Sequence, residues 1–181
     1  MPDDPRESVL SELREAVQVL SREMNAVLIP EVGSNIAYGL PGAREPEEVA
    51  AVQGRIVRLS GKVHPVGQVA FGASDHVARI VITTIRFDPL VRCAANIRYS
   101  SEAIEILEDM FLDVCSFDRT AEPPGVKTMD WGVASCCRQG VPDVIYDLGA
   151  VGKEPMIRLL GEDPSAVVKN ILKLSARMNK E

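Results

Sequence analysis

The chain has 181 residues, of which 46% are hydrophobic and 25% charged, and its formal net charge is −6. This length fits one domain that can bury a sizeable core. The negative charge argues against a nucleic-acid-binding protein, which is usually basic, although it leaves room for a local basic pocket. No apolar stretch approaches the roughly 20 residues that span a bilayer, and the acidic segment 1–6 is not a signal peptide.

The apolar residues that follow recur at helical spacing and predict a first helix that runs to about Glu23. Asp4 is suited to cap this helix, and Pro5 is suited to its first turn. We expect this N-terminal helical extension, residues 1–24, to pack on the domain formed by residues 25–181 or on a second subunit.

Short apolar or alternating runs, bounded by glycine and proline, then predict strands. The runs at 55–59 and 63–70 are separated by Ser60-Gly61 and are expected to form a hairpin. The expected elements are, in order, strands at 27–30 and after Ser34, a short helix at 46–52, and strands at 55–59 and 63–70.

Helices and strands alternate through the second half of the chain. Ser74, Ser100 and Thr128 are placed to cap helices, and Asp163-Pro164 opens the last one. The expected elements are a helix at 75–86, a strand at 93–99, a helix from Ser100 to about residue 112, a strand at 114–117, a helix from Thr128 to about residue 138, a strand at 144–146, a loop at 149–155 and a final helix. This alternation indicates a layered α/β domain, and several strand connections are too short for helical crossovers, so we predict a mixed sheet.

The four cysteines are Cys93, Cys115, Cys136 and Cys137. They form no Cys-x-x-Cys pair, so neither a zinc ribbon nor a redox motif is indicated. Cys93 and Cys115 lie among apolar residues and are expected to be small core residues. A reducing compartment, and therefore the cytoplasm, is the location we expect.

Three loops, at 33–35, 71–79 and 147–154, collect small residues and potential phosphate ligands. The second loop is the most suggestive, because its glycine allows close backbone approach and the helix after it presents free N–H groups to an anion. His76 and Arg79 lie one turn apart and can face one site. An ordinary capped helix with an exposed histidine would show the same pattern.

Further candidates have equally simple structural explanations. Arg55 and Arg58 can be ligands or solvated residues at a sheet edge, and Asn96 and Arg98 can be ligands or surface alternation. Asp118-Arg119 follows a strand end, where α/β sites often lie, but can also be a local ion pair. Asp147 with Lys153-Glu154 can grip a metal–diphosphate unit or form an exposed charged loop.

Taken together, these loops resemble the ThiN family from about residue 25 to residue 175. The matching blocks occur in the same order along the chain. They are Ile29 to Tyr38, Gly54 to Arg58, Phe71 to Arg79, Phe87 to Pro89, Asn96 to Ser100, Ser116 to Arg119, Pro142 to Asp147 and Gly152 to Arg158.

The resemblance implies a three-layer α/β/α fold with a mixed, mostly antiparallel sheet, as in the class II aldolase group. It also implies thiamine-phosphate synthase activity, in which hydroxymethylpyrimidine diphosphate and hydroxyethylthiazole phosphate give thiamine phosphate and diphosphate. The family's catalytic arginine and histidine correspond to Arg55 and His76. The implied substrate-binding residues are Gly33, Ser34, Asn35, Gly72, Ala73, Ser74, Arg79, Asn96, Arg98, Asp118, Arg119, Asp147, Lys153 and Glu154.

The resemblance also suggests Mg²⁺ for the diphosphate and small-molecule substrates rather than nucleic acid or membrane. The apolar stripe of the N-terminal helix leaves a homodimer open as well. Two other functions stay open. One is a non-catalytic sensor of thiamine phosphate, which would share nearly every pocket residue. The other is an aldolase or epimerase, but such enzymes use three zinc-binding histidines, and this chain has only His64 and His76.

Overall fold

A computed structural model describes residues 4–178, apart from the side chains of Thr128 and Met129. Seven strands form one sheet in the order β5-β2-β1-β6-β9-β8-β7, and β3 pairs with β4 in a separate hairpin. Every neighbouring pair is antiparallel except β7 with β8, so the sheet is mixed, as predicted. The strands are β1 (Asn35–Gly39), β2 (Val49–Val52), β3 (Ile56–Leu59), β4 (Lys62–Pro65), β5 (Val69–Phe71), β6 (Cys93–Arg98), β7 (Val114–Ser116), β8 (Val144–Asp147) and β9 (Met156–Gly161).

Local side-chain caps set where several helices begin. Asp4 accepts a hydrogen bond from the Arg6 amide, Ser100 from the Ala103 amide, and Asp163 from the Ala166 amide. The helices are α1 (Pro5–Glu23), α2 (His76–Phe87), α3 (Ser101–Asp109), α4 (Thr128–Cys137) and α5 (Pro164–Arg177). Lys127 holds the N-cap position of α4, and the predicted cap by the Thr128 side chain lies outside the described residues.

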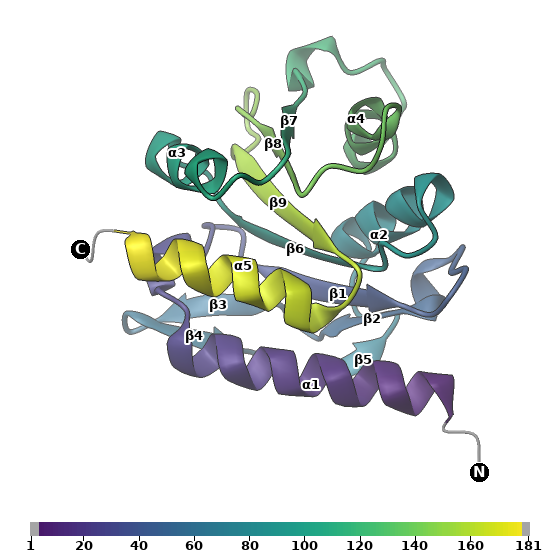
Figure 1. Cartoon of the computed structure of the whole chain (residues 1–181), viewed down its shortest axis with the longest axis vertical. Helices are drawn as coiled ribbons and strands as arrows, with labels where there is room; N and C mark the ends of the chain where they lie inside the picture. Colours follow the sequence, from purple (N-terminus) through teal and green to yellow (C-terminus); the bar gives the residue numbers. More distant parts are fainter. Residues whose placement is uncertain (1–3, 179–181) are drawn as a thin grey trace.

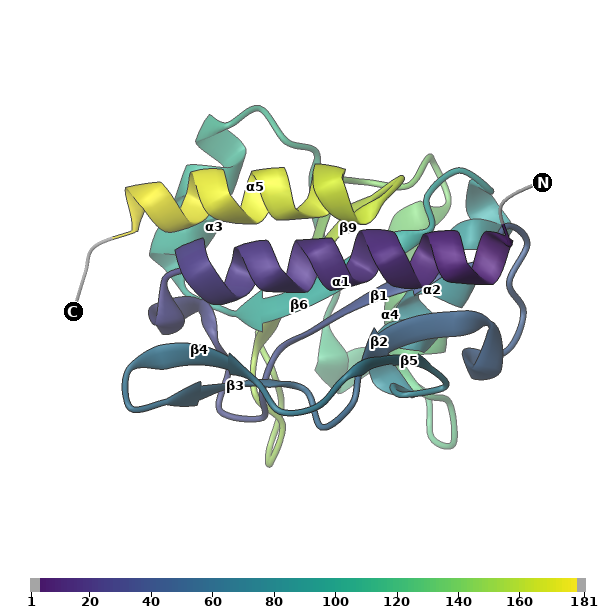
Figure 2. The ribbon, with the colours of Figure 1, turned by 90° about the horizontal axis from the view of Figure 1, so that it is seen from below.

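Helices cover both faces of the sheet (Figures 1 and 2). Helices α1, α3 and α5 share one buried cluster with the sheet residues Ile36, Ile97 and Ile157. Helices α2 and α4 share a second cluster with Ala37 and Ala94. Ile36 and Ala37 are adjacent in β1 and therefore point to opposite faces, so one strand supplies both clusters.

The predicted N-terminal extension contributes directly to the first cluster. Leu13 and Leu20 of α1 are buried, and α1 runs beside α5 across the same face of the sheet (Figure 2). Residues 1–3 and 179–181, at the outer ends of the two predicted segments, lie outside the described residues.

Three predictions about secondary structure are wrong. Residues 27–30 do not form a strand, because the Asn25 side chain accepts a hydrogen bond from the Val27 amide and begins a 3₁₀ turn at Ala26–Leu28. The predicted short helix at 46–52 is a 3₁₀ turn, Pro46–Glu48, followed by β2, whose apolar residues pair with β1 and β5. The single strand predicted at 63–70 is two strands, β4 in the hairpin and β5 at the edge of the seven-stranded sheet. In addition, the inner strand β9 was not predicted at all.

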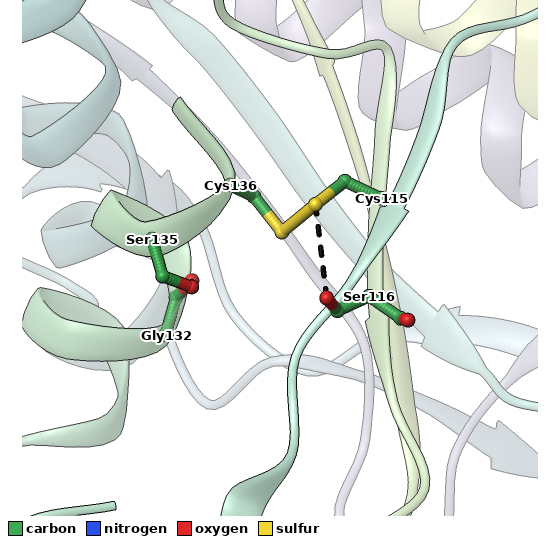
Figure 3. The surroundings of a disulfide bond; sticks show 5 residues. All are labelled: Cys115, Ser116, Gly132, Ser135 and Cys136. Atoms are coloured by element: carbon green, nitrogen blue, oxygen red, sulfur yellow. Dashed lines mark hydrogen bonds between the residues drawn. A yellow bond between two sulfur atoms is a disulfide. The ribbon is translucent and has the colours of Figure 1, made fainter. Parts of the chain in front are cut away.

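The expectation that Cys115 is a simple core thiol is also wrong. Cys115 of β7 forms a disulfide with Cys136 of α4, with their Cα atoms 5.9 Å apart (Figure 3). Cys93 and Cys137 are free and buried. The disulfide fastens α4 to the edge of the sheet, beside the residues described next.

Candidate active site

A cavity of about 370 Å³ lies where the loops at 31–35, 52–56, 72–76 and 147–155 converge with the start of α2. This volume suits a small organic ligand. Its lining residues are Val32, Gly33, Asn35, Arg55, Ala73, Ser74, Asp75, His76, Val77, Ile80, Asn96, Arg119, Gly152, Lys153, Glu154, Met156 and Arg158.

The structure brings most of the sequence-predicted site residues to this cavity. Those that line it are Gly33, Asn35, Arg55, Ala73, Ser74, His76, Asn96, Arg119, Lys153 and Glu154. Those outside the lining are Ser34, Gly72, Arg79, Arg98, Asp118 and Asp147. The sequence analysis did not propose Asp75, Val77, Ile80, Met156 or Arg158.

Arg55 lies in a tight turn and not on the strand predicted for it. Gly54 and Arg55 both have positive φ, at 73° and 70°, and β3 begins only at Ile56. The turn is pinned, because Ile56 and Ser34 exchange two backbone hydrogen bonds of 2.7 and 2.8 Å. The Arg55 guanidinium donates to the Val32 carbonyl at 2.6 Å and is otherwise exposed at the cavity.

His76 is the first residue of α2 and lines the cavity beside Asp75. The preceding Ser74 accepts a hydrogen bond from the Val77 amide, so the first helical turn is held in place. Partial burial lowers the pKa of His76 below its ordinary value, and the positive charges of Arg55 and Arg119 lower it further, whereas Asp75 opposes the shift. The free protein therefore holds a neutral imidazole at pH 7.

Arg79, one turn after His76, faces another way. Its guanidinium pairs with Asp75 at 3.0 Å and with Asp130 of α4 at 3.9 Å. Arg79 therefore ties the start of α2 to α4 and positions Asp75.

Two asparagines shape the Gly33 loop. Asn96 accepts from the Asn35 amide at 2.7 Å and donates to the Gly33 carbonyl at 3.2 Å. The Asn35 side chain donates to the Val52 carbonyl and accepts from the Val52 amide. The polar atoms of both side chains are thus engaged by backbone, which makes them positioning residues.

Glu154 joins two loops across the cavity. Its carboxylate accepts from the amides of Glu31 and Val32 at 2.9 and 3.2 Å. The neighbouring Lys153 lies near Glu122, with a nitrogen–oxygen distance of 3.6 Å, and its side chain is 48% exposed. We call Arg55, Asp75, His76 and Lys153 the rim of the cavity, because their side chains are exposed to solvent.

We define the floor of the cavity as Arg119 and Arg158, which line it, together with Asp147, which contacts both but is not part of the lining; this group is largely buried. The side chains of Asp147 and Arg158 are 0% and 2% exposed, and Arg158 Nη2 lies 2.8 Å from Asp147 Oδ2. Arg119, with 12% of its side chain exposed, lies 3.7 Å from the other carboxylate oxygen and donates to the Glu154 carbonyl. Asp118 caps the 3₁₀ turn Arg119–Ala121 and so positions Arg119.

The lining is positive although the chain as a whole is acidic. Arg55, Arg119, Lys153 and Arg158 line the cavity, against the carboxylates of Asp75 and Glu154. Within residues 4–178 no group of three or more histidine, cysteine or carboxylate side chains is arranged to hold a metal ion. Such a cavity suits an anionic ligand with an apolar portion, since Val77, Ile80 and Met156 supply an apolar wall.

Comparison with known proteins identifies the family of this chain. The family model described as thiamine-phosphate synthase ThiN matches residues 12–173. The bifunctional thiamine biosynthesis protein ThiDN of Methanocaldococcus jannaschii is 47% identical over 169 residues, which are 92% of this chain and 40% of that protein. The thiamine-phosphate synthase ThiN of Methanothermobacter thermautotrophicus is 39% identical over 173 residues, or 91% of each chain.

Solved structures agree with these relatives. The crystal structure of the C-terminal domain of a phosphomethylpyrimidine kinase has a TM-score of 0.87 at 43% identity and covers 93% of this chain and 99% of that one. A sugar-phosphate aldolase from Thermotoga maritima reaches a TM-score of 0.53 at 10% identity, a likeness of fold alone. The family model and both curated relatives cover nearly the whole chain, so the chain belongs to the ThiN thiamine-phosphate synthase family.

Proposed function

We propose that this cavity joins hydroxymethylpyrimidine diphosphate to hydroxyethylthiazole phosphate, giving thiamine phosphate and diphosphate. The observation that carries the proposal is the meeting of Arg55 and His76, from distant segments, at one positively charged cavity in a ThiN-family chain. The chain spans 40% of the bifunctional relative's length, and the proposal concerns this reaction alone.

In the proposed reaction the thiazole nitrogen forms a bond to the pyrimidine methylene carbon, while the bond from that carbon to the diphosphate oxygen breaks. The exposed Arg55 guanidinium can donate two parallel hydrogen bonds to the departing diphosphate. The start of α2 lines the same cavity, and a helix N-terminus favours an anion. These groups act by positioning and electrostatics, and no protein nucleophile is needed.

His76 has a matching role at the leaving group. Its imidazole is neutral in the free protein and can donate one hydrogen bond. A bound diphosphate would favour the protonated form, which would let His76 pass a proton to the departing oxygen.

We also propose Mg²⁺ as the partner of the diphosphate. Asp75 and Glu154 are the carboxylates that line the cavity, and Glu154 is engaged by two backbone amides. Asp75 also pairs with Arg79, but its side chain is 55% exposed, and it is the residue that would hold the ion, with the remaining positions taken by diphosphate oxygens and water, a mode of binding that Mg²⁺ favours. When bound, the ion would neutralise negative charge on the leaving group.

The aldolase alternative finds no support in the positions of the histidines. His76 lines the cavity, whereas His64 lies on β4 of the separate hairpin and does not. We propose instead that the shared feature is architectural, a three-layer α/β/α arrangement of the class II aldolase type. Helices on both faces of a mostly antiparallel sheet and the TM-score of 0.53 support this assignment.

We propose a homodimer formed through the groove between α1 and α5. The groove has an apolar floor that includes Val19 and Leu172, with Glu12 and Glu15 on the α1 side and Lys169 and Lys173 on the α5 side. A two-fold axis parallel to these helices would set the acidic wall of one copy against the basic wall of the other. The variant Lys169→Glu/Lys173→Glu should sediment as a monomer. Adding Glu12→Lys/Glu15→Lys to that variant should restore the dimer.

We place the protein in the cytoplasm, as a proposal that rests on its biosynthetic relatives and no longer on its cysteines, because Cys115 and Cys136 form a disulfide. No helix within residues 4–178 combines the length and apolarity that crossing a membrane requires.

The activity is tested by incubating the pure chain with both substrates, with Mg²⁺ and with a chelator, and measuring thiamine phosphate. We expect product with Mg²⁺ and much less with the chelator. Tight binding of thiamine phosphate with no product under any metal would instead identify a sensor.

A further inference from the structure

The floor of the cavity carries an unbalanced positive charge. Asp147 is the carboxylate that contacts both Arg119 and Arg158, and it lies within 2.8 and 3.7 Å of their nitrogens. Two guanidinium groups against one carboxylate leave a net charge of +1 in a place with little solvent. Burial lowers the pKa of Arg158, Asp147 opposes this shift, and the nearby charge of Arg119 adds to it.

Two donors of this floor are also unused. Arg158 Nη1 and Arg119 Nε are buried and have no hydrogen-bond partner among the described residues. A buried polar group without a partner is costly and uncommon in native proteins, so each such donor calls for an explanation. Both residues line the cavity, which makes a ligand the natural partner.

The surroundings hold Arg158 in place. The Phe117 ring lies 5.3 Å from Arg158 Cζ, and Trp131 packs edge-on against Phe117 at 6.1 Å. Gly132 of α4 permits this contact, because a Cβ there would come within 2.4 Å of the Phe117 ring. The guanidinium is therefore fixed by Asp147 and Phe117 before any ligand arrives.

We propose that Arg119 and Arg158 form a subsite for the phosphate monoester group that the thiazole substrate and the thiamine phosphate product share. A dianionic monoester would offset the buried positive charge and accept hydrogen bonds from both unused donors. The diphosphate would then lie at the solvent-exposed rim, near Arg55 and His76, from which it can leave. This inference rests on the proposed function for the identity of the ester.

The test compares the affinities of hydroxyethylthiazole phosphate and of unphosphorylated hydroxyethylthiazole by calorimetry. Four proteins are needed: wild type, Arg119→Gln, the double variant Asp147→Asn/Arg158→Met, and Arg86→Gln as a control. The double variant removes the carboxylate together with its closest partner, so the charge that remains at the floor is that of Arg119, whose side chain is 12% exposed. Arg86 is an exposed arginine at the far end of α2. Arg86→Gln therefore changes the net charge by the same amount as Arg119→Gln, but outside the cavity.

Wild type should bind the ester more tightly than the alcohol. Arg119→Gln and the double variant should each reduce this preference at least about tenfold, while Arg86→Gln should keep it. An undiminished preference in Arg119→Gln, or no preference in wild type, overturns the subsite. Arg119→Gln decides the matter even if the double variant does not fold.

The subsite and the proposed function can fail separately. Normal synthesis of thiamine phosphate with an ester preference that does not depend on Arg119 would refute the subsite and leave the function intact. Ester binding that depends on Arg119, in a protein that makes no thiamine phosphate, would refute the function and leave the subsite intact.

Discussion

The floor and the rim of the cavity both present arginines to a ligand, but the protein holds them in different ways. Arg158 projects from the inner strand β9 and is fixed by a buried carboxylate. Arg55 sits in a turn with positive φ, and its side chain donates a hydrogen bond to the backbone carbonyl of Val32. Burying a charge in the core fixes its orientation but lowers the stability of the fold. A charge at the rim can be changed with little effect on folding.

Breaking the buried pair of Asp147 and Arg158 gives the strongest test of this difference between floor and rim. Arg158→Met leaves the Asp147 carboxylate buried without its closest partner and should lower the free energy of unfolding by about 3–5 kcal/mol. Asp147→Asn/Arg158→Met removes both charges and should recover most of that loss. Urea denaturation of the two variants measures the difference, and a loss under about 1 kcal/mol in the single variant would show that the floor is not integral to the fold.

The floor is also the part of the site that the sequence analysis could not assemble. Periodic apolar residues and caps predicted α1, α2 and α5, because these features are local. Strand β9 was missed because Pro155 precedes it and a charged residue, Arg158, interrupts its apolar run. The ion pair that stabilises Arg158 in the core joins β9 to Asp147 of β8, so no local sequence pattern indicates it.

The rim was easier to predict, because the ThiN-like loops carry Arg55 and His76 in recognisable blocks. The side-chain directions were not available from those blocks. Arg79 turns to Asp75 and Asp130, and Asn35 and Asn96 bind backbone around Gly33. The pairing of Cys115 with Cys136 was equally hidden, since it depends on how α4 docks against β7.

At the rim, Arg55 should matter more for the reaction than for folding. If its guanidinium grips the departing diphosphate, Arg55→Ala should raise the activation barrier by about 3 kcal/mol or more. Arg55→Lys should lower turnover more than it weakens substrate binding, because an ammonium cannot reproduce the two parallel hydrogen bonds.

Steady-state kinetics with melting curves would separate these effects. Arg58→Ala is the matched control, because Arg58 is exposed on the adjoining strand β3 and does not line the cavity. A lysine variant with full turnover would exclude the two-hydrogen-bond role of Arg55.

His76→Asn should reduce turnover by roughly 10²-fold, since a general acid or hydrogen-bond donor at the leaving group contributes about that much. The effect on folding should be small, because the side chain is partly exposed. His64→Asn alters the histidine on β4, away from the cavity, and should leave turnover unchanged. Equal turnover in the two variants would remove His76 from the mechanism.

The smallest effect concerns the charge of His76 itself. Its pKa in the folded protein is lowered from 6.5, chiefly by burial, so the unfolded chain binds a proton more readily as the pH falls. This residue therefore costs no stability above pH 6.5 and lowers stability progressively as the pH falls through 6.5 and then through the folded-state pKa. His76→Asn should flatten the loss of stability between pH 7.5 and 5 by a modest amount.

Nuclear magnetic resonance titration measures the pKa of His76 directly. This pKa should lie below 6.5 and should rise in Arg55→Ala, because that variant removes one of the nearby positive charges that lower it. A folded-state pKa at or above 6.5 would contradict the lowering of the pKa by burial and by the neighbouring positive charges.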